Sequence, residues 1–105
     1  MGTNYYAVQK RPSLYRTMLH LGKASAGWKF LFHGYMNNDF TIKSIEDWKN
    51  YIRSKDLVII DEYDTIVNRN KFFKMVEDFQ SNENPDNFKD AVNVEGYRFS
   101  FREFR

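Results

Sequence analysis

The order of apolar and polar residues predicts two extended segments at the start of the chain. Residues 3–9 are rich in β-forming side chains, and this run stops before Pro12. In residues 14–21 the more apolar of the two alternating sets includes Leu19 and should face the core, which leaves His20 on the opposite face. We therefore expect two strands, the second of which carries a histidine on its outer face.

A short segment with two glycines, residues 22–27, separates this strand from a third predicted strand, residues 28–35. In the third strand Trp28 and the next two alternate residues, both phenylalanine, share one face, and His33 lies on the other. A hairpin made from the second and third strands would place His20 and His33 on the same face.

Two later segments show the spacing of amphipathic helices. Ser44, followed three residues later by Asp47, resembles a capping box with Asp in place of Glu, and isoleucine and tryptophan residues recur after it at helical spacing. This helix should end near Lys55. Asn68 is a suitable N-cap for a second helix, in which Phe72 begins the apolar stripe.

The most aliphatic run in the chain, residues 57–60, is bounded by polar residues and predicts a strand that is buried on both faces and central in its sheet. Residues 88–95 fit no single pattern. Residues 97–104 alternate strictly, with Tyr97 and the following aromatics inward and the arginines outward. The sequence predicts one α+β domain over residues 1–105, in the order β-β-β-α-β-α-β, with two helices packed on a mostly antiparallel sheet.

Composition supports this single domain and excludes several classes of protein. Of the 105 residues 42% are hydrophobic and 18% aromatic, which is enough for one aromatic-rich core. The net charge of +2 is too weak for a strongly basic nucleic-acid clamp or an acidic DNA mimic. The lack of cysteine excludes disulfides, thiolate catalysis and cysteine-based zinc sites. No apolar stretch approaches the roughly 20 residues of a membrane span, so we expect a cytoplasmic protein. We also expect no metal and no cofactor.

The segment 22–27 is the first candidate site. Its flanking glycines would let backbone N–H groups converge on an anion, and Lys23 and Ser25 would add donors. It lacks the spacing of a Walker loop and precedes a strand instead of a helix, so it is not a P-loop. A six-residue hairpin loop without a ligand is the alternative.

Two further groups of side chains suit chemistry. His20 and His33 would form an acid and base pair or bind a metal if the hairpin register sets them opposite each other; solvated histidines on a sheet face are the alternative. Asp61 and Glu62, at the end of the aliphatic run, would hold a divalent cation or form a solvated turn. Arg98 and Arg102 with their aromatic neighbours would suit a single-stranded nucleic acid or a nucleotide, but those aromatics alternate toward the core. No catalytic constellation is complete, so we assign no catalytic residue.

Five short motifs extend over nearly the whole chain: MGTNYY at 1–6, HLGKASAGWKF at 20–30, DW at 47–48, IDEY at 60–63 and EGYRFS at 95–100. Their combination resembles a family of small uncharacterised proteins found mainly in bacteriophages. Many relatives have a Cys-x-x-Cys zinc knuckle between the first two strands, where this chain reads KRPSLY at 10–15. The resemblance implies an accessory protein that acts in the cytoplasm of a bacterial host.

Three functions are open from the sequence. The leading hypothesis is a non-enzymatic phage protein that binds and inhibits or modulates a host bacterial protein, such as a defence or nucleic-acid-processing factor. The alternative is a nucleotide-binding or nucleotide-cleaving protein that uses the hairpin of the two histidines. A third is a homodimer that pairs through an unpaired C-terminal aromatic strand. The candidate binding residues are His20, Lys23, Ser25, Trp28, His33, Asp61 and Glu62.

Overall fold

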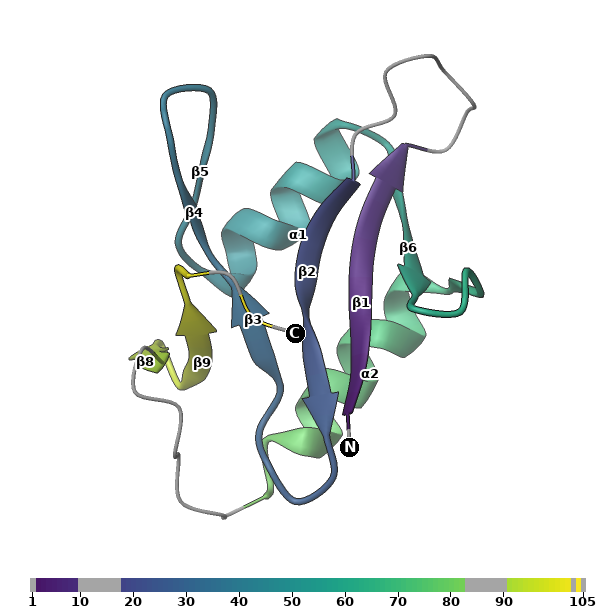
Figure 1. The fold of residues 1–105 in the computed structure, drawn as a ribbon, viewed down its shortest axis with the longest axis vertical. Helices are drawn as coiled ribbons and strands as arrows, with labels where there is room; N and C mark the ends of the chain where they lie inside the picture. Colours follow the sequence, from purple (N-terminus) through teal and green to yellow (C-terminus); the bar gives the residue numbers. More distant parts are fainter. Residues whose placement is uncertain (1, 10–17, 83–90, 103, 105) are drawn as a thin grey trace.

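The computed structural model describes residues 2–9, 18–82, 91–102 and 104. They form a seven-stranded, mostly antiparallel sheet with two helices on one face, which confirms the predicted α+β class (Figure 1). The strands are β1 Gly2–Gln9, β2 Met18–Ser25, β3 Leu31–His33, β4 Tyr35–Met36, β5 Thr41–Ile42, β6 Leu57–Asp61, β7 Ile66–Val67, β8 Ala91–Val94 and β9 Tyr97–Ser100. The helices are α1 Ile45–Ser54 and α2 Arg69–Phe79. No helix in these ranges is long and apolar enough to cross a membrane.

The sheet has the strand order β7-β6-β1-β2-β3-β9-β8, and β4 and β5 form a separate two-stranded sheet. Among the described neighbours β3 and β9 run parallel, and the other pairs are antiparallel. The aliphatic strand β6 was predicted to be central, which is wrong, because it lies second from one edge. Both faces of β6 are nevertheless covered. Leu57 and Ile59 belong to the core cluster on the helix side, and Ile60, only 4% exposed, pairs with Tyr6 on the opposite face.

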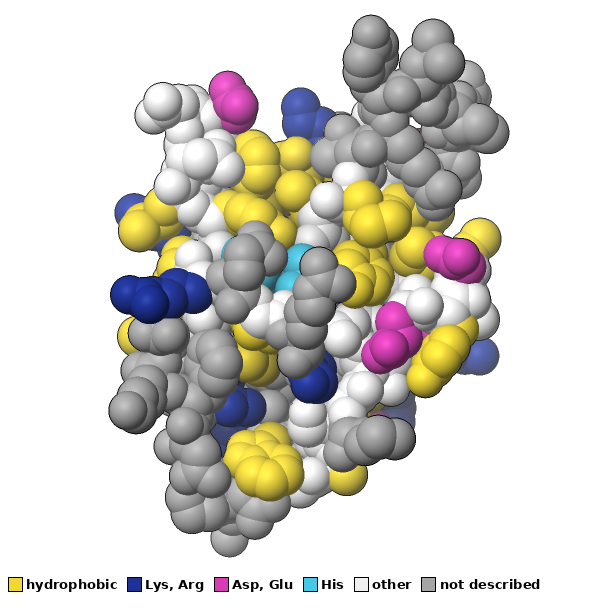
Figure 2. Space-filling model, viewed as in Figure 1, with side chains coloured by type: hydrophobic (Ala, Val, Ile, Leu, Met, Phe, Trp, Pro, Cys, Tyr) yellow, Lys and Arg dark blue, Asp and Glu magenta, His cyan; other side chains and the backbone are white. Residues whose placement is uncertain are grey.

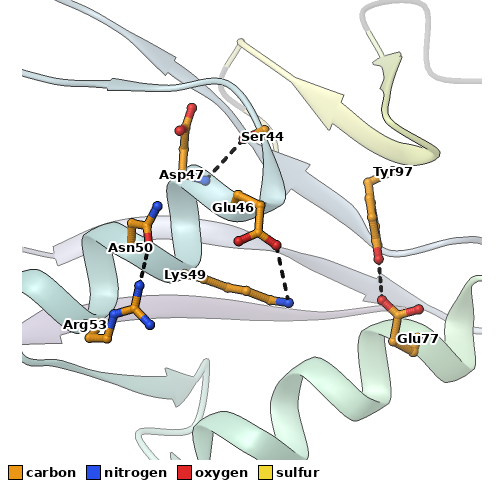
Figure 3. Close-up of polar contacts among 8 residues, drawn as sticks. All are labelled: Ser44, Glu46, Asp47, Lys49, Asn50, Arg53, Glu77 and Tyr97. Atoms are coloured by element: carbon orange, nitrogen blue, oxygen red, sulfur yellow. Dashed lines mark hydrogen bonds and ion pairs between the residues drawn. The ribbon is translucent and has the colours of Figure 1, made fainter.

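Helix α1 begins where its capping residues predict. The side chain of Ser44 accepts the N–H of Asp47 at 3.1 Å (Figure 3). The Asp47 carboxylate accepts the N–H of Lys43 at 2.9 Å, so the capping box closes one residue earlier than the standard pattern. Trp48 is fully buried on the inner face, and its Nε1–H donates to the carbonyl of His33 at 2.9 Å. This bond fixes α1 against the end of β3.

Helix α2 also begins where the sequence predicts, directly after the N-cap Asn68. The Asn68 side chain accepts the N–H of Lys71 at 3.2 Å, and Phe72 and Val76 are fully buried. Both helices therefore cover the same face of the sheet with the apolar stripes that their sequences predict.

The predicted six-residue loop after the second strand is wrong. Strand β2 continues through Ser25, and the turn follows it, with Gly27 at a φ of 88°. Gly22 is inside the strand, where a Cβ would lie 2.3 Å from the carbonyl oxygen of Leu31 and 2.4 Å from the ring of Phe30. Glycine is needed here for space in a strand. The predicted beginning of this strand, residues 14–17, lies outside the described residues.

The predicted third strand, residues 28–35, is shorter than expected. Strand β3 ends at His33, and β4 begins after Gly34. A Cβ on Gly34 would lie 2.4 Å from the ring of Phe101, and the N–H of Gly34 donates to the carbonyl of Ser100 at 2.7 Å. The C-terminal segment thus packs against this position and ends the strand.

The C-terminal strand is also shorter than predicted, because β9 ends at Ser100. Ser100 is fully buried instead of outward, and its Oγ accepts the N–H of Arg102 at 3.3 Å as the chain bends. Strand β9 pairs with both β3 and β8, so it is not an unpaired edge, and the basis of the predicted homodimer is wrong. The segment 88–95 contains β8, followed by a turn with Glu95 and Gly96 at positive φ; residues 88–90 lie outside the described residues.

Candidate functional site

A bulge in β2 decides which side chains share the open face, the face of the sheet that the helices do not cover. Strands β1 and β2 pair Tyr5 with Gly22 but Tyr6 with His20, which leaves Leu21 as the extra residue. Leu21 is in the core cluster, and Gly22 faces the Phe30 ring, so both lie on the helix side. Residues after the bulge have therefore changed sides relative to strict alternation.

Because of this bulge, Lys23 and Ser25 lie on the open face together with His20. A Cβ on Gly2 would lie 2.6 Å from both Lys23 Cε and Ser25 Oγ, so these two side chains pack over the start of β1. The backbone of this stretch pairs with β1 and β3. Its N–H groups therefore point along the sheet and do not converge on an anion.

The structure brings His20 and His33 together on neighbouring strands, with 5.5 Å between their ring centroids. Nε2 of His20 is 2.9 Å from Oδ1 of Asn4, and Nδ1 of His33 is 2.8 Å from the carbonyl oxygen of Gly34. Both partners are acceptors, so each of these ring nitrogens is the protonated one in this arrangement.

The histidine rings lie within an aromatic cluster. The rings of Tyr35 and Phe104 are 4.3 Å and 5.4 Å from that of His33, and Phe104 is 4.6 Å from His20. His33 is only 2% exposed. The Tyr35 hydroxyl accepts the N–H of His20 at 3.0 Å and is 3.2 Å from the carbonyl oxygen of the same residue. This side chain therefore bonds the backbone of β2 at a point that β3 does not reach. A substrate reaching both imidazoles would first have to displace Phe104.

These histidines belong to a cross-strand row that runs over the open face. The register pairs Ile66 with Ile60, Ile60 with Tyr6, and Tyr6 with His20, and His33 follows on β3. Figure 2 shows this face, with histidine atoms near its centre and hydrophobic side chains beside them. The cross-strand row is buried at His33 and exposed at its other end, where Ile66 is 70% accessible.

Asp61 and Glu62 shape the turn between β6 and β7. Oδ1 of Asp61 accepts the N–H groups of Tyr63 at 2.8 Å and Thr65 at 3.0 Å. Oε1 of Glu62 accepts the N–H of Asn4 at 2.8 Å. Within the described ranges no group of three or more His, Asp or Glu side chains is placed to hold a metal ion. The two carboxylates are therefore part of the framework of the turn.

Trp28 lies beyond the other end of β2. Its N–H donates to the carbonyl of Ser25 at 3.1 Å, and its own carbonyl accepts Nδ2–H of Asn82 at 2.9 Å, which joins this turn to the segment after α2. The five residue steps from His20 to Ser25 span roughly 16 Å in a strand. Ser25 and Trp28 therefore lie away from the histidine pair, and Lys23, which is opposite Asn4 in the register, packs over the start of β1.

Several residues of the open face were not predicted from the sequence. Tyr6 has a signal, because it alternates with the core residues of β1. Tyr63 and Ile66 also have one, since they are large apolar residues in a polar turn. Tyr35 has one as well, because it follows His33 by two residues and stacks on its ring. Phe104 has none, because its contacts with the histidines depend on the return of the C-terminal segment.

No protein-family model, no curated protein and no solved structure matches this chain. The site is therefore interpreted from its own residues.

Proposed function

We propose that this chain is a non-enzymatic binding protein whose partner is a bacterial protein. The observation that supports this most directly is the exposure of two large apolar side chains, Tyr63 at 75% and Ile66 at 70%, at the open end of the cross-strand row. We call these two residues the Tyr63–Ile66 patch. The resemblance of the sequence motifs to bacteriophage proteins supports the setting, an accessory protein that modulates a host factor in the bacterial cytoplasm.

The Tyr63–Ile66 patch is held in place before any partner binds. Asp61 accepts two backbone N–H groups of the turn, and Glu62 bonds the turn to β1. Ile66 is paired with Ile60 in the sheet. An ordered surface loses little conformational entropy on association, and tyrosine is among the residues that contribute most to protein interfaces.

Charge around the patch indicates the kind of partner. Glu62 and Asp64 are exposed beside it, and Asp61 is half-buried at its base. A partner surface with an apolar pocket and a basic rim would complement this arrangement. We therefore expect binding to weaken as salt is raised, because exposed charges are screened.

Affinity capture from a bacterial lysate tests the proposal with matched variants. Tyr63→Ser removes the aromatic ring of the patch and leaves Ile66 in place, and Met36→Ser is the control because Met36, 64% exposed on β4, lies outside the patch. We expect one partner to be retained by the wild type and the control and lost by Tyr63→Ser. With the purified partner, Tyr63→Ser should weaken binding about 30-fold or more, equivalent to about 2 kcal/mol.

Three outcomes would count against this proposal. The first is the absence of any specific partner for the folded protein. The second is an equal effect of Tyr63→Ser and Met36→Ser. The third is loss of binding only with Lys23→Ala or Trp28→Ala, which would move the interface to the β2–β3 turn. Unfolding curves control for stability, since exposed substitutions should change the free energy of unfolding by no more than about 0.5 kcal/mol.

One observation favours a second candidate, a protein that binds or cleaves nucleotides. It is the proximity of His20 and His33, whose ring centroids are 5.5 Å apart. A thermal-shift screen with mono-, di- and cyclic nucleotides tests it, because a ligand present at about 100 times its Kd stabilises the fold by about 2.7 kcal/mol. If cleavage is found, His20→Ala and His33→Ala should each abolish it. A flat screen eliminates this candidate.

A further inference from the structure

A groove of about 550 Å³ lies between α1 and the start of α2, on the helix side of the sheet. Lys49 and Arg53 line it from α1, and Asn68, Arg69 and Phe73 from the α2 side. This volume is within the range of pockets that hold small organic ligands. The groove shares no residue with the open face.

The lining of the groove is cationic. It includes two guanidinium groups and one ammonium group, and no carboxylate. The Lys49 ammonium lies 3.9 Å from a carboxylate oxygen of Glu46 on its own helix (Figure 3). It also lies 5.3 Å from the centre of the Phe73 ring on α2, so its charge lies between the two helices. Within the described part of the chain no carboxylate forms an ion pair with Arg53 or Arg69. The positive charge of the groove is therefore only partly compensated.

The two helices differ in the charges near their ends. Helix α1 has Glu46 and Asp47 in its first turn and Arg53 in its last, as the helix dipole favours. Helix α2 has no acidic residue in its first turn, where Arg69 and Lys71 follow the N-cap. Cations at this end are unfavourable for the isolated helix, and Arg69 adds to the positive field of the groove. An anion bound between the helices would offset two unfavourable effects: the cations beside the positive end of the α2 dipole, and the repulsion among the cations of the groove.

We propose that this groove binds phosphate groups, supplied either by a free nucleotide or by the backbone of a single nucleic-acid strand. The planar forks of Arg53 and Arg69 suit phosphate oxygens, and Lys49 adds a point charge. The half-buried ring of Phe73 offers an apolar surface for a sugar or base beside the charges. This proposal and the one for the Tyr63–Ile66 patch concern different residues, so each can fail without the other.

The test measures binding of three probes: pyrophosphate, ATP and an oligothymidylate of about twelve nucleotides. Calorimetry serves for the first two and fluorescence anisotropy for the third, at low and physiological salt. The double variant Arg53→Gln/Arg69→Gln removes two groove charges. Lys43→Gln/Lys74→Gln is the control, because it changes net charge equally at two exposed residues that do not line the groove.

We expect at least one probe to bind with a Kd of roughly 1–100 µM, and the arginine variant to weaken it about 10-fold or more while the control changes it less than about 3-fold. If the oligonucleotide binds much more tightly than ATP, the ligand is a nucleic-acid strand. In that case the slope of the logarithm of the binding constant against the logarithm of the salt concentration should become shallower by about 1.4 when both arginines are removed. Equal binding of ATP and oligonucleotide indicates a nucleotide site. Failure of all three probes to saturate at about 1 mM, or equal weakening by the control, overturns the proposal.

Discussion

Replacing Gly22 with alanine tests whether this glycine is needed for space in a strand or for freedom in a loop. The added Cβ would lie 2.3 Å from the carbonyl oxygen of Leu31 and 2.4 Å from the ring of Phe30, whereas ordinary contacts begin near 3.4 Å. One obstacle is backbone in the neighbouring strand, so rotation of the Phe30 side chain cannot relieve the contact. The sheet would have to open locally.

Gly96 is the matched control because its situation is the reverse. It has a φ of 91°, and a Cβ there would meet nothing within 4 Å. Gly96→Ala should destabilise the protein by about 1 kcal/mol through backbone strain alone. Gly22→Ala should cost about 3 kcal/mol, the upper end of the usual range for overpacking, because a backbone atom must move. At about 4–8 °C per kcal/mol, the melting temperature should fall by roughly 12–24 °C for Gly22→Ala and 4–8 °C for Gly96→Ala.

Urea unfolding monitored by tryptophan fluorescence gives both free energies, and the slopes show whether the transition stays two-state. The reasoning is refuted if Gly22→Ala costs no more than Gly96→Ala. That result would mean that position 22 has room for a side chain, as it would in a loop.

Three further predictions concern the helices and a surface tyrosine. Trp48→Phe should lower the free energy of unfolding by about 2–3 kcal/mol, because it leaves the buried carbonyl of His33 without this donor and creates a void. Asn68→Ala should cost about 1 kcal/mol through loss of the N-cap of α2. In a spectrophotometric titration Tyr97 should ionise with a pKa of about 12, because its hydroxyl donates to Glu77 and because burial and nearby negative charge also oppose ionisation. Since the pKa of an unfolded tyrosine is near 10, this contribution to stability is complete below about pH 10 and is lost as pH rises toward 12.

Specific outcomes would contradict each of these. A free energy of unfolding of Trp48→Phe within about 0.5 kcal/mol of the wild-type value would show that the hydrogen bond from the Trp48 indole to the carbonyl of His33 contributes little. Asn68→Ser should keep most of the stability that Asn68→Ala loses, since serine is also a good N-cap. Glu77→Gln should bring the pKa of Tyr97 down toward its ordinary value, and an unchanged titration would exclude Glu77 as the main cause.

The helices could be predicted because their determinants are local. Ser44 and Asn68 satisfy backbone donors within three residues, and the apolar stripes follow directly. The lengths of the strands could not be predicted in this way, because contacts from distant parts of the chain end them. Gly34 ends β3 where Phe101 packs, and Phe104 reaches the histidines only after the chain has bent past β9.

The β8–β9 hairpin is an intermediate case. Glu95 and Gly96 have φ values of 54° and 91°, the positive values that a two-residue hairpin turn requires. Glycine at the second position is a visible signal for such a turn. Glutamate at the first is a poor one, since Asn and Asp are preferred there, so tertiary pairing of β9 with β3 decides the structure.

The bulge in β2 is also visible in the sequence once its effect is known. Leu19, Leu21 and Ala24 are the residues of this stretch whose side chains face the helices, and they are spaced by two and then by three. A regular strand has a period of two, so the alternation breaks between Leu21 and Gly22, which both lie on the helix side. Gly22 can follow Leu21 on this side because it adds no side chain to a surface already occupied by the Phe30 ring. The same glycine therefore permits the close approach of β3 and places Lys23 on the face of the sheet that the helices leave open.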